Sequence, residues 1–152
     1  MELVLLAVGR LRPYYRQACD DYARRLSRHV TFREVEVREA SRAPTEKSQQ
    51  SEEAERLLAQ APSVGSLVAL ERSGTAWSSP EVARQLDRWL LSARPVALVL
   101  GGSHGLSPTL LARADLQWSL GPLTLPHELA RVVVVEQIYR GFSILRGEPY
   151  HK

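Results

Sequence analysis

Three glycines around a serine and a histidine form the first motif whose residue types could do chemistry. The motif GGSHG spans residues 101–105 and directly follows the apolar run 96–100. Glycines at the carboxyl end of a strand let a ligand approach the backbone closely, and open α/β sheets bind ligands at that edge. The motif therefore predicts a ligand-binding turn, with a glycine turn that binds nothing as the simpler alternative.

The same motif has the G-x-S-x-G pattern of the nucleophile elbow in serine hydrolases. Asp115 and then His127 or His151 follow Ser103 in the chain order of a hydrolase triad. Three observations disfavour this interpretation: the chain is short for such a hydrolase, Asp115 comes soon after a short predicted helix, and the helix after the motif is predicted to begin at Ser107. A dinucleotide site is disfavoured because the pattern G-x-G-x-x-G is absent.

The segment 120–127, with the sequence LGPLTLPH, is a second candidate binding element. It is apolar although it has the glycine and prolines of an irregular loop, and an apolar loop commonly lines a pocket. Its backbone N–H and C=O groups could bind the edge of an adenine ring while its leucine side chains cover the ring faces. Taken alone, the segment fits equally well as a loop that packs over the core.

Ionisable and aromatic residues near the C-terminus form the third candidate. Glu136, Tyr139 and Arg140 lie close together in a predicted helix, and Tyr150 and His151 are followed by a terminal lysine. A tail after a helix is ordinarily frayed. These residues therefore matter chemically only if the tail reaches a site.

Alternating strands and helices are predicted to position these three segments. Short apolar runs predict strands at 3–8, 32–37, 66–70, 96–100 and 116–120. Amphipathic spacing and helix-start signals predict helices at 13–29, 51–61, 79–92 and 107–114, with a polar loop at 39–50. This order indicates an α/β fold with a parallel sheet and helical crossovers, and 152 residues suit one domain spanning 1–152.

The segment from residue 126 onward carries conflicting signals. The valine run 132–135 is β-branched and would normally indicate a strand. We predict a helix instead, because the segment is longer than a typical strand and the tripeptide Pro-His-Glu at 126–128 is a suitable helix start. The residues that share one face of this helix are Leu129, Val132, Val133, Glu136, Tyr139 and Arg140.

Charge and cysteine content limit the classes of protein to consider. There are 20 Lys and Arg residues against 17 Asp and Glu residues, and the formal net charge of +3 does not by itself argue for nucleic-acid binding. The one cysteine, Cys19, cannot form an internal disulfide or a thiolate zinc site, and no metal site is predicted. The N-terminal apolar run ends at Val8, far short of a membrane span, so we expect a cytoplasmic protein without a membrane partner.

Several motifs, in order along the chain, resemble the RlmH (YbeA) family. Members of this family are SPOUT-class methyltransferases that act on N3 of a pseudouridine in 23S ribosomal RNA. The matching segments are LLAVGR, LVALERSGTAWSSPE, LVLGGSHGLSP, WSLGPLTLPHELARVVVVEQIYRGFSI and the closing PYHK. The resemblance extends essentially from end to end. One departure is His104, where relatives often carry a different residue, which leaves the turn intact but puts a role for this side chain in doubt.

The resemblance implies a SPOUT-type fold, with helices on both sides of the parallel sheet and a C-terminal trefoil knot. It implies S-adenosyl-L-methionine as the cofactor and a homodimer whose active site draws on both subunits. The residues that it assigns to cofactor binding are Leu70, Gly101, Leu120, Gly121, Pro122, Leu123, Thr124 and Leu125. They fall in the same two loops that the local sequence marks, and in the end of one predicted strand.

The resemblance also implies that Tyr150, His151 and Lys152 close over the site and help to engage RNA, with Arg140 nearby. Because N3 of a pseudouridine carries a proton, a base must remove this proton or a cation must favour the anion. The candidates for this role are His151, Glu136 and Arg140, in that order, and Tyr150 is a further catalytic candidate. So small a chain is expected to recognise 23S rRNA within the assembled ribosome.

Two other functions stay open at this point. One is a serine hydrolase that uses Ser103 as its nucleophile. The other is a binding protein that keeps the fold without catalysis, which would bind the cofactor without transferring its methyl group.

Overall fold

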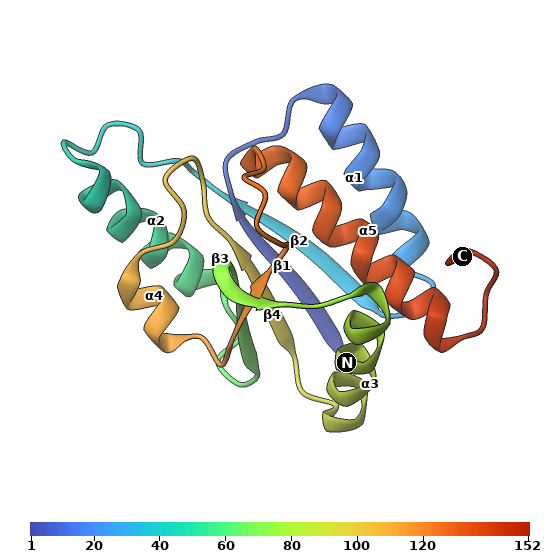
Figure 1. Ribbon diagram of the computed structural model, residues 1–152. Coiled ribbons are helices and arrows are strands. Elements are labelled where there is room, and N and C mark those ends of the chain that lie inside the picture. The colour runs from blue at the N-terminus through green and yellow to red at the C-terminus, as the bar shows by residue number, and fades with distance from the viewer.

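A parallel sheet of five strands, in the order β2-β1-β4-β3-β5, forms the centre of the computed structural model, which describes residues 1–152 (Figure 1). The strands are β1 (Glu2–Val8), β2 (Thr31–Val37), β3 (Ser66–Ala76), β4 (Val96–Leu100) and β5 (Leu116–Ser119). The helices are α1 (Pro13–Leu26), α2 (Glu46–Gln60), α3 (Ser79–Ser92), α4 (Pro108–Arg113) and α5 (His127–Leu145). All paired strands are parallel, so the predicted α/β class with helical crossovers is confirmed.

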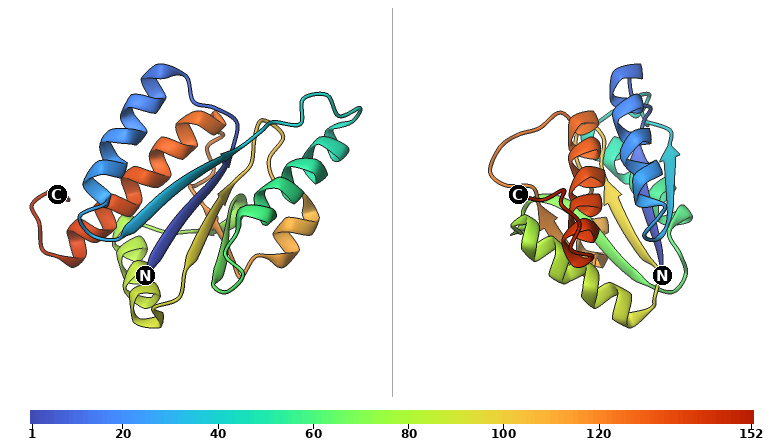
Figure 2. Two further views of the ribbon diagram at one scale, coloured as in Figure 1. Left: turned by 180° about the vertical axis from the view of Figure 1, so that it is seen from behind. Right: turned by 90° about the vertical axis from the view of Figure 1, so that its right-hand side faces the viewer.

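Helices cover both faces of the sheet (Figure 2). Helices α1, α3 and α5 pack on one face, where Leu5 of β1 shares a core with Ile138 of α5. Helices α2 and α4 pack on the other face, where Leu6 shares a second core with Leu57 of α2. Strands β1 and β4 lie in the interior of the sheet, and helices cover both of their faces. Residues 3–8 and every residue of β4 are therefore buried. This double burial explains why both strands are unbroken apolar runs.

Element boundaries differ from the prediction by more than one residue at three places. Helix α1 ends at Leu26, a few residues before the predicted end. Helix α2 begins five residues earlier than predicted, because Thr45 and Ser48 cap each other: Ser48 N donates to Thr45 Oγ1 at 3.0 Å and Thr45 N donates to Ser48 Oγ at 3.1 Å. Strand β3 does not end at Leu70, because residues 71–74 leave the ladder and Thr75 returns to pair with β5.

The conflicting segment 126–140 forms most of α5 and is helical, as predicted. Val134 and Ile138 lie one turn apart and are buried in the core, so tertiary packing overrides the β propensity of the valine run. The residues of the predicted helical face, among them Leu129 and Val132, are only half-buried. An apolar strip of α5 is therefore left partly uncovered.

Arg131 of α5 ties this helix to the carboxyl ends of β1 and β2. Its side chain is only 2% exposed, and its guanidinium donates to Glu34 at 3.0 Å, to Glu36, and to the carbonyl oxygen of Gly9 at 2.9 Å. Arg16 of α1 forms a bidentate ion pair with the same Glu34. Burial alone would raise the pKa of Glu34, but hydrogen bonds from Arg16 and Arg131 lower it overall. The carboxylate is therefore ionised at neutral pH and balances the buried guanidinium.

Replacing Arg131 with methionine is expected to lower the free energy of unfolding by about 1–3 kcal/mol, because Glu34 keeps only Arg16 as a partner and the carbonyl oxygen of Gly9 loses the donor that Arg131 supplies. Denaturant titration followed by circular dichroism measures the change. The matched control is Arg33→Met, which removes an exposed pair with Glu2 and should cost at most about 1 kcal/mol. Equal losses in the two variants would contradict the role given to Arg131.

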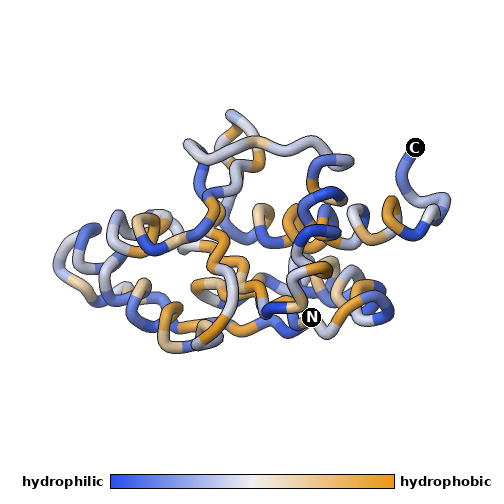
Figure 3. Tube along the Cα trace, turned by 90° about the horizontal axis from the view of Figure 1, so that it is seen from below, coloured by the Kyte–Doolittle hydropathy of each residue, from blue (hydrophilic) through white to orange (hydrophobic).

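Hydropathy follows the layering of the fold (Figure 3). Apolar segments run through the centre of the molecule, whereas the tail after α5 is hydrophilic and lies at the periphery. None of the helices combines the length and apolar character needed to cross a membrane.

Candidate functional site

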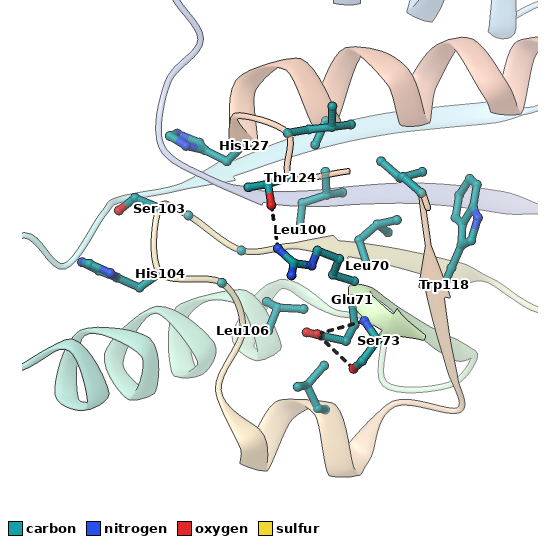
Figure 4. Close-up of a pocket in the computed structure, with 18 of the residues that line it drawn as sticks. Leu70, Glu71, Ser73, Leu100, Ser103, His104, Leu106, Trp118, Thr124 and His127 are labelled. Carbon is teal, nitrogen blue, oxygen red and sulfur yellow. Dashed lines mark hydrogen bonds between the residues drawn. The ribbon is translucent and has the colours of Figure 1, made fainter. Parts of the chain in front are cut away.

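A cavity of about 790 Å³ opens at the carboxyl edge of the sheet, where β4 and β5 end and β3 leaves its ladder. Three chain segments supply most of its wall: residues 100–106, residues 70–73, and residues from the end of β5 to the start of α5. Figure 4 shows Leu70, Leu100 and Thr124 around this space, with His104 and His127 at its edge. Parallel strands bring their carboxyl ends to one edge, which is why segments remote in sequence meet here.

The glycine turn 101–105 is tight and leaves backbone open to the cavity. Gly105 N donates to Gly102 O at 3.1 Å, and Gly105 has a φ of +73°, a conformation that favours glycine. A Cβ on Gly101 would lie 2.5 Å from the carbonyl carbon of Gly105, so only glycine fits there. Gln50 of α2 stabilises the turn, because its Nε2 donates a hydrogen bond to the carbonyl oxygen of His104 at 2.6 Å.

The loop 120–125 is held against residues 71–74 by side-chain hydrogen bonds. Arg72 donates to Thr124 Oγ1 at 2.6 Å (Figure 4), and Ser119 Oγ donates to Arg72 O at 2.9 Å. Ser119 Oγ also accepts a hydrogen bond from Gly121 N at 3.0 Å, and Gly121 has a φ of +110° that favours glycine. These contacts place the leucines of the loop beside Leu70.

Seven of the eight residues predicted to bind the cofactor line this one cavity. They are Leu70, Gly101, Leu120, Gly121, Leu123, Thr124 and Leu125. The eighth, Pro122, is exposed and is not part of the lining. Gln50, Arg72 and Trp118 also line the cavity and were not predicted. Trp118 lies within an apolar strand, and nothing in the local sequence indicates that Gln50 and Arg72 approach the site.

The predicted catalytic residues form a second cluster, toward the far end of α5. Glu136 Oε1 accepts hydrogen bonds from Arg140 Nε at 2.9 Å, from Arg140 NH2 at 2.6 Å and from the Tyr150 hydroxyl at 3.0 Å. The guanidinium carbon of Arg140 lies 4.7 Å from the centre of the Tyr150 ring. Arg140 NH1 lies 3.3 Å from Nδ1 of His151. Arg140 is therefore held in one orientation by three neighbours.

These contacts define the charge state of the cluster. Hydrogen bonding to Glu136 raises the pKa of Arg140 above its ordinary value, so the guanidinium stays cationic. Burial raises the pKa of Tyr150 well above its ordinary value, so the phenol stays protonated. An arginine can only donate hydrogen bonds, so Nδ1 of His151 accepts in this contact and Nε2 is the ring nitrogen that can donate to another group. Both oxygens of Glu136 already accept hydrogen bonds, one of them from Gln137.

The two clusters are separated within one chain. His127, at the start of α5, lines the cavity, whereas Arg140 is thirteen residues further along the helix, about 20 Å away at 1.5 Å per residue. Figures 1 and 2 show the C-terminal tail beyond the far end of α5, away from the glycine turn. A single chain thus does not bring the predicted cofactor residues and the predicted catalytic residues together.

The geometry does not support a serine hydrolase. Asp115 lies before β5, at the amino edge of the sheet, where its Oδ2 accepts a hydrogen bond from Leu67 N at 2.7 Å. Ser103 lies at the opposite, carboxyl edge, and α4 begins only at Pro108 instead of supporting the serine.

No three His, Cys, Asp or Glu side chains are grouped closely enough to hold a metal ion.

Comparisons with known proteins give this fold and site a family context. The family described as "Predicted SPOUT methyltransferase" matches residues 1–151. Two relatives are each named "Ribosomal RNA large subunit methyltransferase H". The one from Anaeromyxobacter sp. (strain Fw109-5) is 47% identical over 153 residues, which cover 100% of both chains. The one from Hahella chejuensis is 41% identical over 156 residues, which cover 100% of this chain and 99% of the relative.

Solved structures share the fold at low sequence identity. A probable methylase family protein from Haemophilus influenzae aligns with 99% of this chain and 70% of its own, with a TM-score of 0.55 and 14% identity. A probable methyltransferase from Bordetella pertussis aligns with 92% of this chain and 93% of its own, with a TM-score of 0.54 and 17% identity. At these identities, the likeness concerns the fold alone.

Proposed function

Because this chain belongs to the SPOUT methyltransferase family, which matches residues 1–151, we propose that it transfers a methyl group from S-adenosyl-L-methionine to N3 of a pseudouridine in 23S ribosomal RNA. The observation that carries the proposal is that the segments predicted to bind the cofactor, remote in sequence, line one cavity. The RNA substrate is supported by relatives at 41–47% identity whose shared name is ribosomal RNA large subunit methyltransferase H. The nucleotide and its N3 atom follow from the family resemblance.

The cavity suits S-adenosyl-L-methionine in size and in chemistry. Its volume of about 790 Å³ lies within the usual range for small-molecule pockets. Leu70, Leu120 and Leu125 offer apolar surface for the faces of an adenine ring, and the turn 101–105 lets a ligand approach the backbone. The bound cofactor supplies a methyl group on a positively charged sulfonium.

Arg140 and His151 are suited to stabilise negative charge on the acceptor base. Methyl transfer requires an imide nitrogen without its proton, aligned with the methyl donor. We infer that the Arg140 guanidinium and the Nε2–H of His151 donate hydrogen bonds to the carbonyl oxygens beside N3, while the N3 proton leaves to solvent. Fixed donors aimed at developing charge are a strong source of catalysis. Glu136 positions Arg140 instead of serving as a base, because its oxygens are already occupied.

His151→Ala is expected to slow methylation about 10- to 100-fold without changing cofactor affinity, because one hydrogen bond to a charged group is lost. The pH dependence of the methylation rate distinguishes a hydrogen-bond donor from the general base that is predicted from the sequence. If His151 is a donor, the rates of wild type and variant rise with pH in parallel. If His151 is a base, the wild-type rate levels off at a pH where the rate of the variant still rises, and the donor role is wrong.

We propose that a homodimer completes the site. Within one chain, Arg140 lies about 20 Å from His127, so the tail that reaches a given cavity belongs to a second subunit. The half-buried strip of α5 around Leu129 and Val132, together with the exposed Leu123, supplies apolar surface for that contact. A two-fold axis between antiparallel copies of α5 would bring each tail to the other subunit's cavity and complete two equivalent sites.

Mixing two inactive variants tests the shared site. Arg140→Ala alters only the tail cluster, and Gly101→Ala alters only the cavity. After subunit exchange at equal concentrations, the mixture should recover about a quarter of wild-type activity, because about half of the dimers are mixed and each has one complete site. Each variant exchanged with itself is the control. No recovery, although differently tagged subunits co-purify, would contradict a site shared between subunits.

We also propose the C-terminal trefoil knot that the family resemblance implies. In the structure, residues 71–74 leave the ladder beside β5 and pass close to it, since a Cβ on Gly74 would lie 2.5 Å from the carbonyl oxygen of Gln117. Pulling the termini apart in an optical trap tests the knot. A knotted chain stops short of its full contour length by the residues held in the knot, and complete extension would show an unknotted chain.

The substrate that we propose is 23S rRNA in the assembled ribosome, which places the protein in the cytoplasm. The test is mass spectrometry of ribosomal RNA after undermethylated ribosomes are incubated with the protein and isotope-labelled S-adenosyl-L-methionine. Label on a single pseudouridine is the expected result. Cofactor binding without methyl transfer would identify the non-catalytic binding protein. More efficient methylation of naked rRNA than of ribosomes would contradict recognition of the assembled particle.

A further inference from the structure

Glu53 is a buried carboxyl group close behind the glycine turn, and the proposed mechanism does not use it. It lies on α2 and is 1% exposed. Its Oε2 accepts hydrogen bonds from Ala40 N at 3.0 Å and from Gln49 Nε2 at 3.1 Å. Its Oε1 is buried without a hydrogen-bond partner. A buried acceptor that lacks both a donor and a cation is unfavourable, so its place in the fold calls for an explanation.

The unpartnered oxygen of Glu53 faces the turn that lines the cofactor cavity. A Cβ placed on Gly102 would lie 3.4 Å from Glu53 Oε1, and both Gly101 and Gly102 line the cavity. The backbone of the turn therefore separates the carboxyl group from a ligand in the cavity. Charges interact more strongly through such a poorly hydrated layer than through water.

We propose that Glu53 recognises the positive charge of S-adenosyl-L-methionine and so distinguishes this donor from S-adenosylhomocysteine, the product, an inference that rests on the proposed function. Methyl transfer forms the bond from N3 to the methyl carbon and breaks the bond from that carbon to sulfur. The bonding pair stays on sulfur, which becomes a neutral thioether. The attraction to Glu53 is lost at that moment, so the product binds more weakly than the donor and leaves the site.

Replacing the carboxyl group of Glu53 with an amide of the same size tests this role. Glu53→Gln is the variant, and Glu55→Gln is the matched control, because Glu55 is the same residue type on the same helix but is exposed. Isothermal titration calorimetry measures the affinity of each protein for S-adenosyl-L-methionine and for S-adenosylhomocysteine. The ratio of the two affinities is expected to fall about five- to tenfold in Glu53→Gln and to stay unchanged in Glu55→Gln. If Glu53 had only a structural role, Glu53→Gln would weaken the binding of both ligands alike. An unchanged ratio of affinities would therefore overturn the proposal.

A comparison in the wild type tests whether the cavity recognises positive charge if Glu53→Gln does not fold. Sinefungin carries an amine that is cationic at neutral pH in place of the sulfonium, and it has no transferable methyl group. It is expected to bind more tightly than S-adenosylhomocysteine, and equal affinities would overturn the charge recognition. Wild-type protein that binds none of the three compounds would overturn the proposed function itself, so the two failures are distinguishable.

Discussion

Arg140→Ala is expected to lower kcat for rRNA methylation about 100- to 1,000-fold, the loss that is typical when a fixed donor to developing negative charge is removed. The guanidinium is held in place by Glu136, by the ring of Tyr150 and by Nδ1 of His151. Alanine also leaves His151 without the partner that fixes its tautomer. Single-turnover assays at saturating cofactor measure the loss directly.

The affinity of Arg140→Ala for the cofactor should be unchanged, because Arg140 is proposed to contact the acceptor base and is not among the residues that line the cavity. Arg146→Ala is the matched control, since Arg146 is an exposed arginine at the end of α5 that forms no ion pair, and it should keep wild-type kcat. Arg140→Lys should restore only part of the rate, because an ammonium group cannot reproduce the planar fork that engages Glu136. Wild-type turnover by Arg140→Ala would remove this residue from the mechanism.

Much of the fold could be predicted because packing leaves a local pattern in the sequence. Residues 96–100 are apolar without interruption because the strand is covered on both faces. Helix α5 could be assigned despite its valines because its length and its Pro-His-Glu start outweigh β propensity. The cavity loops could be recognised from their glycines, because Gly105 and Gly121 adopt positive φ values where the chain turns under a ligand site.

The parts that could not be predicted depend on contacts between distant segments. The return of β3 to the ladder at Thr75 occurs in exposed residues, which carry no apolar pattern. Glu53 lies in a run of glutamates with Glu52 and Glu55, and only tertiary packing buries it alone among the three. The separation of Arg140 from the cavity is likewise a property of the assembled chain. Sequence motifs marked both halves of the candidate site but not the distance between them.

Gly101→Ala is expected to weaken S-adenosyl-L-methionine binding about 10- to 100-fold, because an extra carbon forced into a packed contact shifts the backbone at a cost of about 1–3 kcal/mol. The added Cβ would lie 2.5 Å from the carbonyl carbon of Gly105 and 2.7 Å from its oxygen. Both atoms belong to the backbone, so no side chain can rotate away and the turn itself must open. Calorimetric titration of the cofactor measures the loss of affinity.

Gly105→Ala separates this steric effect from the loss of a glycine in the turn. A Cβ on Gly105 would meet nothing within 4 Å, and the only penalty is the φ of +73°, which should cost about 1–2 kcal/mol of stability. Cofactor affinity should therefore fall far less in Gly105→Ala than in Gly101→Ala, although both variants lose one glycine. If the two variants bound the cofactor equally well, the close approach of the chain at Gly101 would not be what shapes the cavity, and the assignment of this turn to cofactor binding would be wrong.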